Sequence, residues 1–174
     1  MKIAEKEFTF RQCTADDIDE ILKLQDIVYD ALKDKQWLRK NTVEMLRFCL
    51  EEPNYTVGAY YKGELAAISI LYVPLPEDSA EKLATSLIGI DIDGVRHANY
   101  KLCLVNPKFR GNRLQRILEN KLEEHAKKQG ITLMCATVFP ENIYSVHNIE
   151  GAGYKLNKEF QKYGLKRRLY YKFI

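Results

Sequence analysis

The chain has 174 residues, with 46% hydrophobic and 29% charged side chains, a globular composition that excludes wholesale disorder and fibrous repeats. The net charge is only +3, but residues 1–100 hold 12 basic against 18 acidic side chains, and residues 101–174 hold 15 against 6. We therefore predict a single domain over residues 1–174 whose C-terminal half attracts an anion, such as a phosphate-bearing cofactor, a nucleic acid or an acidic surface.

Membrane insertion and metal binding have no support in the sequence. The longest uncharged apolar stretch, residues 65–75, is far shorter than the roughly 18–20 residues that span a bilayer, and the first residues lack the apolar stretch of a signal peptide. The four cysteines and three histidines are scattered, without the close spacing of a metal site. We expect a cytoplasmic protein with reduced cysteines and no metal.

Hydrophobic periodicity predicts an alternation of strands and helices in the first half of the chain. We expect strands over residues 8–12, 55–61 and 65–73, and helices over about 14–32, 42–50 and 80–90. Thr42 is a candidate N-cap for the second of these helices, and Lys62-Gly63-Glu64 separates the two strands of a hairpin.

A strand, a helix and a second strand follow within about 40 residues. We expect strands over residues 99–105, 131–139 and 169–174, another strand after Gly153-Tyr154, and helices over about 113–129 and 140–152. This order of elements predicts an α/β (α+β) fold with a mixed sheet and helices on both faces.

The turn between the strand at 99–105 and the helix after it is a candidate anion site. A helix N-terminus presents unpaired N–H groups and a partial positive charge, and Gly111 permits backbone conformations closed to other residues. Arg110, Arg113 and Arg116 add positive charge, so a pyrophosphate would suit this turn; a plain turn with solvated arginines is the alternative. The sequence lacks GxxxxGK[ST] and GxGxxG, which removes support for nucleotide hydrolysis and dinucleotide binding through those motifs.

Two segments resemble the GNAT superfamily of acyl-CoA N-acyltransferases. Residues 104–114, LVNPKFRGNRL, are similar to the family's V-x-P-x-[YF]-R-G-x-G-[IL]-[GA], and residues 140–145, PENIYS, followed by Gly153-Tyr154, are similar to P-x-N-x-x-[AS] followed by G-[FY]. The resemblance implies a mostly antiparallel sheet whose fourth and fifth strands are parallel and splay apart to admit the pantetheine arm. It also implies an enzyme that transfers an acetyl group from acetyl-CoA to a primary amine by direct attack in a ternary complex.

The resemblance further implies where the acetyl-CoA would lie. Cys103, Leu104 and Val105 would face pantetheine, and the Val105 N–H would stabilise the oxyanion. Asn142 and Ser145 would lie near the arm or the thioester. The pyrophosphate would be held by Arg110, Gly111, Asn112, Arg113, Leu114 and Gln115.

The chain departs from the family pattern at three positions. Arg113 stands where a second glycine is usual, so that its side chain either crowds the pyrophosphate or reaches a phosphate itself, and the sequence leaves both open. Gln115 stands where Gly or Ala is usual. Ile149 occupies the position of the family's frequent general acid, a tyrosine, and Tyr144 and Tyr163 are the candidates we retain for that catalytic role.

The general base and the acceptor are less constrained. An amine must be neutral to attack, and Asp91 and Asp93 precede the strand at 99–105, where they would accept its proton directly or through water. Residues 25–41 and 155–168 are expected to hold the acceptor, a small-molecule or protein amine. The candidate lining residues are Tyr29, Trp37 and Arg167.

Two other functional classes stay open. Arg113 and Ile149 would suit an acyl-CoA-binding protein with weak or lost catalysis. A basic C-terminal cluster would suit a protein associated with nucleic acid or the ribosome, although we expect no nucleic-acid partner; a homodimer is left open. The cluster comprises Lys155, Lys158, Lys162, Lys166, Arg167, Arg168 and Lys172.

Overall fold

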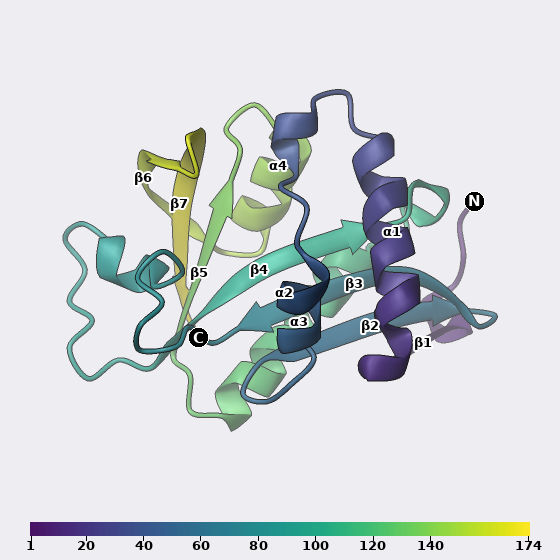
Figure 1. The fold of residues 1–174 in the computed structure, drawn as a ribbon, viewed down its shortest axis with the longest axis horizontal. Helices are drawn as coiled ribbons and strands as arrows, with labels where there is room; N and C mark the ends of the chain where they lie inside the picture. The colour runs from purple at the N-terminus through teal and green to yellow at the C-terminus, as the bar shows by residue number, and fades with distance from the viewer.

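The computed structural model describes residues 1–174 and contains one seven-stranded sheet in the order β1-β2-β3-β4-β5-β7-β6 (Figure 1). The strands are β1 (Phe8–Gln12), β2 (Tyr55–Tyr61), β3 (Glu64–Tyr72), β4 (His97–Val105), β5 (Leu133–Val138), β6 (Lys155–Lys162) and β7 (Leu165–Phe173). The helices are α1 (Ile18–Asp30), α2 (Val43–Phe48), α3 (Leu114–Lys128) and α4 (Ile143–Gly151). Only β4 and β5 pair in parallel, which confirms the predicted mixed, mostly antiparallel sheet.

Helices cover both faces of the sheet, with α1 and α2 in front and α3 behind in the view of Figure 1. Successive side chains of a strand point to opposite faces, so β3 contributes to two cores. Ile68 packs with Ile21 and Leu24 of α1, whereas Leu71 packs with Leu118 of α3. None of the helices combines the length and the apolar composition that a bilayer crossing requires.

Local sequence signals predicted the start of α2 correctly, but the helix predicted over residues 80–90 is wrong. Thr42 caps α2 as expected, because its Oγ1 accepts a hydrogen bond from the Met45 N–H at 3.1 Å. Residues 80–90 form only a short 3₁₀ turn over Leu83–Ser86. Leu83 packs against Leu133 and Leu169 at the far end of the sheet, so burial against the strands decides the conformation of this segment.

The sheet opens between β4 and β5, as the resemblance implied. Their pairing ends at Asn99 and Cys135, although β4 continues to Val105 and stays paired with β3 throughout. The register between β3 and β4 slips at Lys101, which is an extra residue on β4. Such a bulge bends its strand, so β4 turns away from β5 where their pairing stops.

Candidate active site

Two cavities lie in the opening between β4 and β5. The larger, of about 790 Å³, extends from the residues after α1 past the end of β4 to the start of α3 and to α4. The smaller, of about 210 Å³, lies between β4, β5, the β6–β7 turn and the residues before α2. They meet at a junction of six residues that line both: Trp37, Leu38, Cys103, Gln115, Asn142 and Ser145.

The edge of β4 supplies free backbone groups to the larger cavity. The Asn106 N–H donates to the Ala66 carbonyl at 2.9 Å, so Asn106 points toward β3. Alternate residues of a strand direct their backbone groups to opposite sides, so those of Cys103 and Val105 face the opening. Free N–H and C=O groups of this kind bind an extended amide chain as an additional strand. Cys103, Leu104 and Val105, the residues expected to face pantetheine, all line this cavity.

The turn after β4 leads directly into the N-terminus of α3. Gly111 has φ 83° and Arg113, the N-cap of α3, has φ 59°, so both lie in the left-handed region. This conformation costs a residue other than glycine roughly 1–2 kcal/mol, which explains the glycine usual at the position of Arg113. No side chain caps the first turn of α3, so its N–H groups are available to an anion.

Three arginines surround these N–H groups, but Asn112 does not join them. Arg110, Arg113 and Arg116 are exposed and line the larger cavity. Asn112 lines neither cavity, because its amide donates to the Phe109 carbonyl at 2.9 Å and accepts from the Ile3 N–H at 2.8 Å. Its side chain joins the N-terminal segment to the turn, so only the backbone of Asn112 is left for its predicted role at the pyrophosphate.

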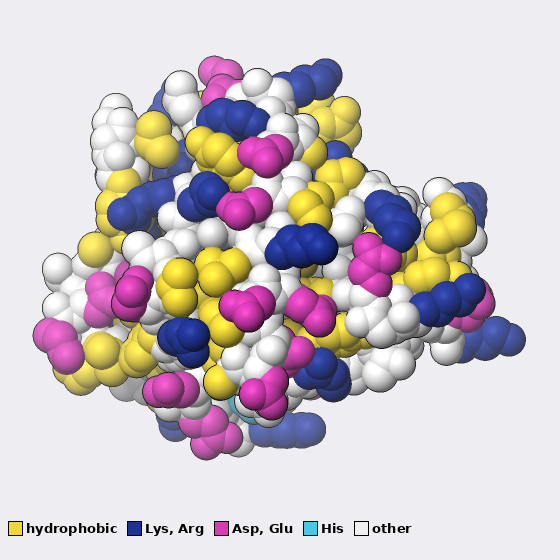
Figure 2. Space-filling view, turned by 45° about the vertical axis from the view of Figure 1, so that its right-hand side comes forward, with side chains coloured by type: hydrophobic (Ala, Val, Ile, Leu, Met, Phe, Trp, Pro, Cys, Tyr) yellow, Lys and Arg dark blue, Asp and Glu magenta, His cyan; other side chains and the backbone are white.

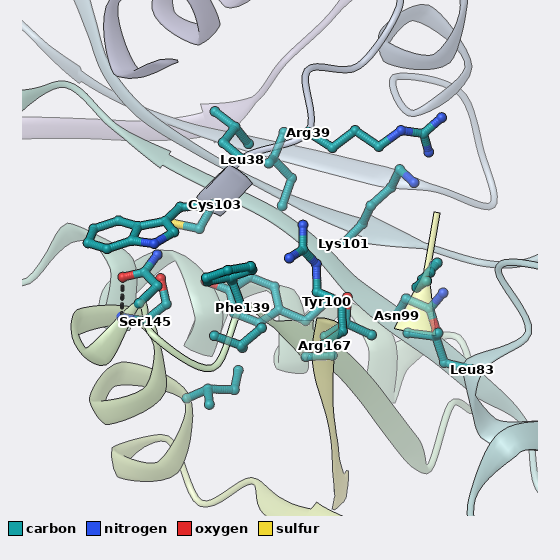
Figure 3. Close-up of a pocket in the computed structure, with 18 of the residues that line it drawn as sticks. Leu38, Arg39, Leu83, Asn99, Tyr100, Lys101, Cys103, Phe139, Ser145 and Arg167 are labelled. Atoms are coloured by element: carbon teal, nitrogen blue, oxygen red, sulfur yellow. Dashed lines mark hydrogen bonds between the residues drawn. The ribbon is translucent and has the colours of Figure 1, made fainter. Parts of the chain in front are cut away.

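The opposite wall is formed by the start of α4. Asn142 caps this helix, because its Oδ1 accepts from the Ser145 N–H at 3.2 Å, the bond drawn as a dashed line in Figure 3. The Asn142 amide N–H₂ remains free at the junction. Gln115 accepts a hydrogen bond from the Asn148 side chain at 2.7 Å and so joins α3 to α4. Leu114, also predicted to bind the cofactor, lies buried beneath the turn and contributes its backbone N–H and its packing.

The smaller cavity contains a buried carboxylate that the sequence analysis missed. Glu81 accepts a hydrogen bond from the Tyr163 hydroxyl at 2.5 Å and pairs with Lys162 at 3.2 Å and Lys101 at 3.4 Å. Burial raises the pKa of Glu81, but these partners outweigh burial, so its pKa lies below the ordinary value and the group is charged. No motif surrounds Glu81, and the only signal was its place in a segment wrongly predicted as a helix.

Figure 3 shows how the smaller cavity is arranged. Cys103 and Ser145 lie toward one end, Asn99 and Leu83 lie toward the other, and the side chain of Arg167 rises between them. The first end coincides with the junction to the larger cavity. The two cavities therefore adjoin at these shared residues, one extending toward the start of α3 and the other toward Asn99.

The structure places the two candidate catalytic tyrosines in different cavities. Tyr144 lines the larger cavity and is 70% exposed, whereas Tyr163 lines the smaller one. Burial and the bond to Glu81 raise the pKa of Tyr163 to about 12. Ile149, at the position of the family's tyrosine, is buried in the lining of the smaller cavity, near the buried Tyr100.

Of the other residues proposed for the acceptor side, Trp37 and Arg167 line the smaller cavity, but Tyr29 lines neither cavity. Asp91 and Asp93 lie in an exposed turn, where the Asp91 carboxylate accepts from the Asp93 N–H at 2.9 Å, and neither lines a cavity. The structure therefore does not support them as a general base. The sequence pattern predicted the turn at residues 91–94 correctly, but it did not indicate that this turn lies away from the two cavities.

Solved structures resemble this fold over almost its whole length. A GNAT-family acetyltransferase from Streptococcus pneumoniae has a TM-score of 0.71 at 18% identity, covering 97% of this chain and 100% of its own. The ribosomal-protein-S18-alanine N-acetyltransferase of Escherichia coli has a TM-score of 0.72 at 14% identity, covering 96% and 94%. A putative acetyltransferase of Salmonella typhimurium, solved with its cofactor acetyl-CoA, has a TM-score of 0.67 at 16% identity, covering 96% and 94%.

The sequence itself gives a match that covers most of the chain. No curated protein sequence matches significantly. The acetyltransferase (GNAT) family, however, matches residues 17–154, which include the opened sheet edge, the arginine turn and α4. The chain belongs to the acetyltransferase (GNAT) family.

Proposed function

We propose that this protein transfers an acetyl group from acetyl-CoA to a primary amine by direct attack in a ternary complex. The amine nitrogen bonds to the thioester carbonyl carbon, the C–S bond breaks, and the sulfur leaves as a thiolate that takes up a proton. The attacking nitrogen loses a proton. No acyl-enzyme is required, and Cys103 and the buried Cys135 act through their backbone and packing.

One observation carries this proposal: the free edge of β4 and the uncapped N-terminus of α3, joined by the turn at residues 106–113, line the same cavity. The pantetheine amides would pair with the backbone of Cys103 and Val105, and the diphosphate would bind the N–H groups after Arg113 together with Arg110. The larger cavity has the volume for such a ligand, at about 790 Å³ against the roughly 300–1,000 Å³ of common ligand sites. The Salmonella protein, which shares the fold and was solved with acetyl-CoA as its cofactor, supports the choice of acetyl-CoA as the ligand.

The thioester would lie at the junction of the cavities. Cys103 lines both cavities, whereas Val105 lines only the larger one, so the Cys103 N–H is better placed than the Val105 N–H to stabilise the oxyanion. Asn142 and Ser145 would face the same atoms from α4. The amine would approach from the smaller cavity, opposite the arriving pantetheine arm.

Two tyrosines are proposed as donors of a proton to the leaving thiolate. The Tyr144 hydroxyl makes no hydrogen bond within the protein and is free to donate in the larger cavity, whereas the Tyr163 hydroxyl is held by Glu81 in the smaller one. Tyr144 is therefore the stronger candidate, since a donor to the sulfur must reach the cofactor side of the junction. A binding protein without turnover is the second candidate function, favoured by Ile149 at the family's tyrosine position.

Release of CoA thiol from acetyl-CoA, measured with a panel of amines, tests the proposal. We expect thiol and acetylated amine to form in equal amounts. Tyr144→Phe removes the hydroxyl proposed to donate a proton to the leaving thiolate. It should lower kcat about 100-fold or more, as loss of a general acid does. Tyr29→Phe is the matched control, because Tyr29 lines neither cavity.

Two results would contradict these assignments. Binding of acetyl-CoA without thiol release for any amine would establish the binding protein. An unchanged kcat in Tyr144→Phe together with a large loss in Tyr163→Phe would transfer the acid role to Tyr163.

A further inference from the structure

The smaller cavity is unusually rich in positive charge. Glu81 is its only carboxylate, and the pairing of Glu81 with Lys101 and Lys162 compensates the charge of that carboxylate. The two arginines that line the cavity have no acidic partner; they stack on aromatic rings instead. The four cations of the lining are Arg39, Lys101, Lys162 and Arg167.

Arg167 is a buried arginine without an acidic partner. It is only 9% exposed, yet no carboxylate lies beside it. Its guanidinium donates to the carbonyls of Gln36 at 3.1 Å and Lys166 at 3.2 Å and stacks over Phe139 at 5.2 Å. These bonds use two of five N–H donors, so the others remain for a ligand. In Figure 3 the guanidinium points toward the middle of the cavity.

The physical cost of such an arrangement also indicates a ligand. A buried guanidinium without a counter-ion is unfavourable, and burial lowers the pKa of Arg167 accordingly. An anionic ligand with two oxygens would accept hydrogen bonds from two N–H groups of Arg167 and neutralise its positive charge.

Arg39 lines the same cavity from another part of the chain. It lies on the segment between α1 and α2, whereas Arg167 lies on β7. Its guanidinium stacks 3.6 Å from the centre of the Tyr163 ring and is exposed at the mouth of the cavity. An anion bound at Arg167 would therefore lie in a cavity that Arg39 also lines, without a carboxylate of the protein to compensate either arginine.

We propose that the acceptor is a small amine that also carries a carboxylate, as an amino acid does. The proposal rests on the acetyl transfer proposed above. Arg167 binds the carboxylate, Arg39 adds positive charge at the mouth of the cavity, and the amino group extends to the junction at Cys103 and Ser145. The cavity of about 210 Å³ is smaller than the roughly 300–1,000 Å³ of drug-sized sites, in agreement with a small acceptor.

The same charges help the reaction. Nearby cations disfavour an ammonium group and so lower the pKa of a bound amine, which increases the neutral fraction that attacks. An acceptor with several ammonium groups and no acid would be repelled by Arg39, Lys101 and Arg167. The cavity therefore selects against polyamines as well as for amino acids.

Matched pairs of acceptors test this proposal. Initial rates of CoA thiol release are measured for the common amino acids, for their carboxamides, for 2-aminoethylphosphonate and for spermidine. We expect at least one amino acid to exceed its own carboxamide about tenfold or more in kcat/KM, and to exceed spermidine by more than that.

Variants of Arg167 and Arg39 test whether these arginines cause the preference for amino acids over carboxamides. Arg167→Gln should lower kcat/KM for the preferred amino acid about tenfold, mainly through KM, and should leave the carboxamide nearly unchanged. Arg39→Gln, which changes an exposed side chain, should lower kcat/KM for the preferred amino acid about threefold. Arg168→Gln is the matched control, because this neighbouring arginine pairs with Glu159 at 3.0 Å and does not line the cavity.

The outcomes separate the two proposals. Equal rates for amino acids and carboxamides, a preference for spermidine, or a preference for the phosphonate would overturn the amino-acid assignment and leave acetyl transfer standing. An amino-acid preference that survives in both Arg167→Gln and Arg39→Gln would overturn the assigned site. Absence of thiol release with every amine would overturn the acetyl transfer and this proposal together.

Discussion

Arg113 shows how a single residue combines backbone strain with a charge. Its left-handed conformation, φ 59°, directs the first N–H groups of α3 toward the larger cavity, and its exposed guanidinium stands at the same place. A glycine would adopt this conformation without strain but would bring no charge. The structure thus makes Arg113 a candidate phosphate ligand.

Arg113→Gly tests this role. We expect acetyl-CoA to bind about three- to tenfold more weakly, because one charge-assisted contact to phosphate is lost at a partly solvated position. The free energy of unfolding should change by less than about 1 kcal/mol, since relief of strain is offset by the greater freedom of glycine in the unfolded chain. Calorimetric titration gives the affinity, and urea unfolding gives the stability.

The control is Arg113→Lys, which keeps the charge and should keep most of the affinity. Tighter binding by Arg113→Gly would show instead that the arginine crowds the pyrophosphate. If the affinity of Arg113→Gly for acetyl-CoA depends less on salt concentration than that of the unmodified protein, the charge contact is supported. Salt screens that contact, and only the arginine makes it.

At the scale of elements, helix α3 carries an acid in a place that favours apolar side chains. Glu119 is 2% exposed, its carboxylate oxygens have no hydrogen-bond partner, and the nearest cations, Arg116 and Lys172, are both 4.0 Å away. Burial, together with the neighbouring Glu123, raises the pKa of Glu119 to about 8. Because the unfolded chain holds this proton less tightly, the contribution of Glu119 to stability falls as pH rises from about 4.5 to about 8.

Glu119→Gln should therefore stabilise the protein at pH 8, by at least about 1 kcal/mol, and have little effect below about pH 4, where the carboxyl is mostly protonated in both states. Lys172 keeps Glu123 as its partner in this variant. Urea unfolding at several pH values measures the effect, and Glu124→Gln, at an exposed position of the same helix, serves as the control. A loss of stability at pH 8 would mean that attraction to Lys172 outweighs the cost of burial.

The sequence predicted those elements whose signals are local. The turn from Arg110 to Arg113, the start of α2 at Thr42 and the order of strands follow from nearby residues, and the structure confirms them. The side-chain contacts of Asn112 could not be predicted, because one partner, the Ile3 N–H, comes from a distant part of the chain.

The acceptor side was predicted least well, for the same reason. Glu81 acquires its environment from Lys101 and Lys162, which lie 20 and 81 residues further along the chain. No spacing rule connects residues that meet only after the sheet has formed. Arg167 was expected on this side, but that it lacks an acidic partner follows only from the structure.

At the scale of the whole molecule, folding cancels much of the uneven charge along the chain. Several cations of the basic C-terminal segment pair with acids: Lys172 with Glu123, Lys162 with Glu81, and both Lys166 and Arg168 with Glu159. On the face shown in Figure 2 basic and acidic side chains are intermixed. Four arginines without an acidic partner, Arg39, Arg110, Arg113 and Arg167, line the two cavities, as a small anionic ligand would require.

Acetyl-CoA should stabilise the whole protein, because it would contact parts of both helical layers. The larger cavity is lined by Val28 and Leu32 near α1, by Val105 of β4 and by Ser145 of α4, so a ligand that fills it links α1 to the sheet and to α4. At 100 times its dissociation constant a ligand adds about 2.7 kcal/mol of stability. For a chain of this size that corresponds to a rise in Tm of roughly 5–10 °C.

Thermal unfolding with increasing acetyl-CoA measures this rise. CoA should produce a similar shift, since the adenosine, diphosphate and pantetheine contacts are shared, whereas adenosine alone should produce almost none. If the cavity binds through the α3 N-terminus, the shift should shrink at high salt and in Arg113→Gly. A Tm unaffected by millimolar acetyl-CoA would remove the basis for acetyl transfer, whatever the preference of the smaller cavity for an anion.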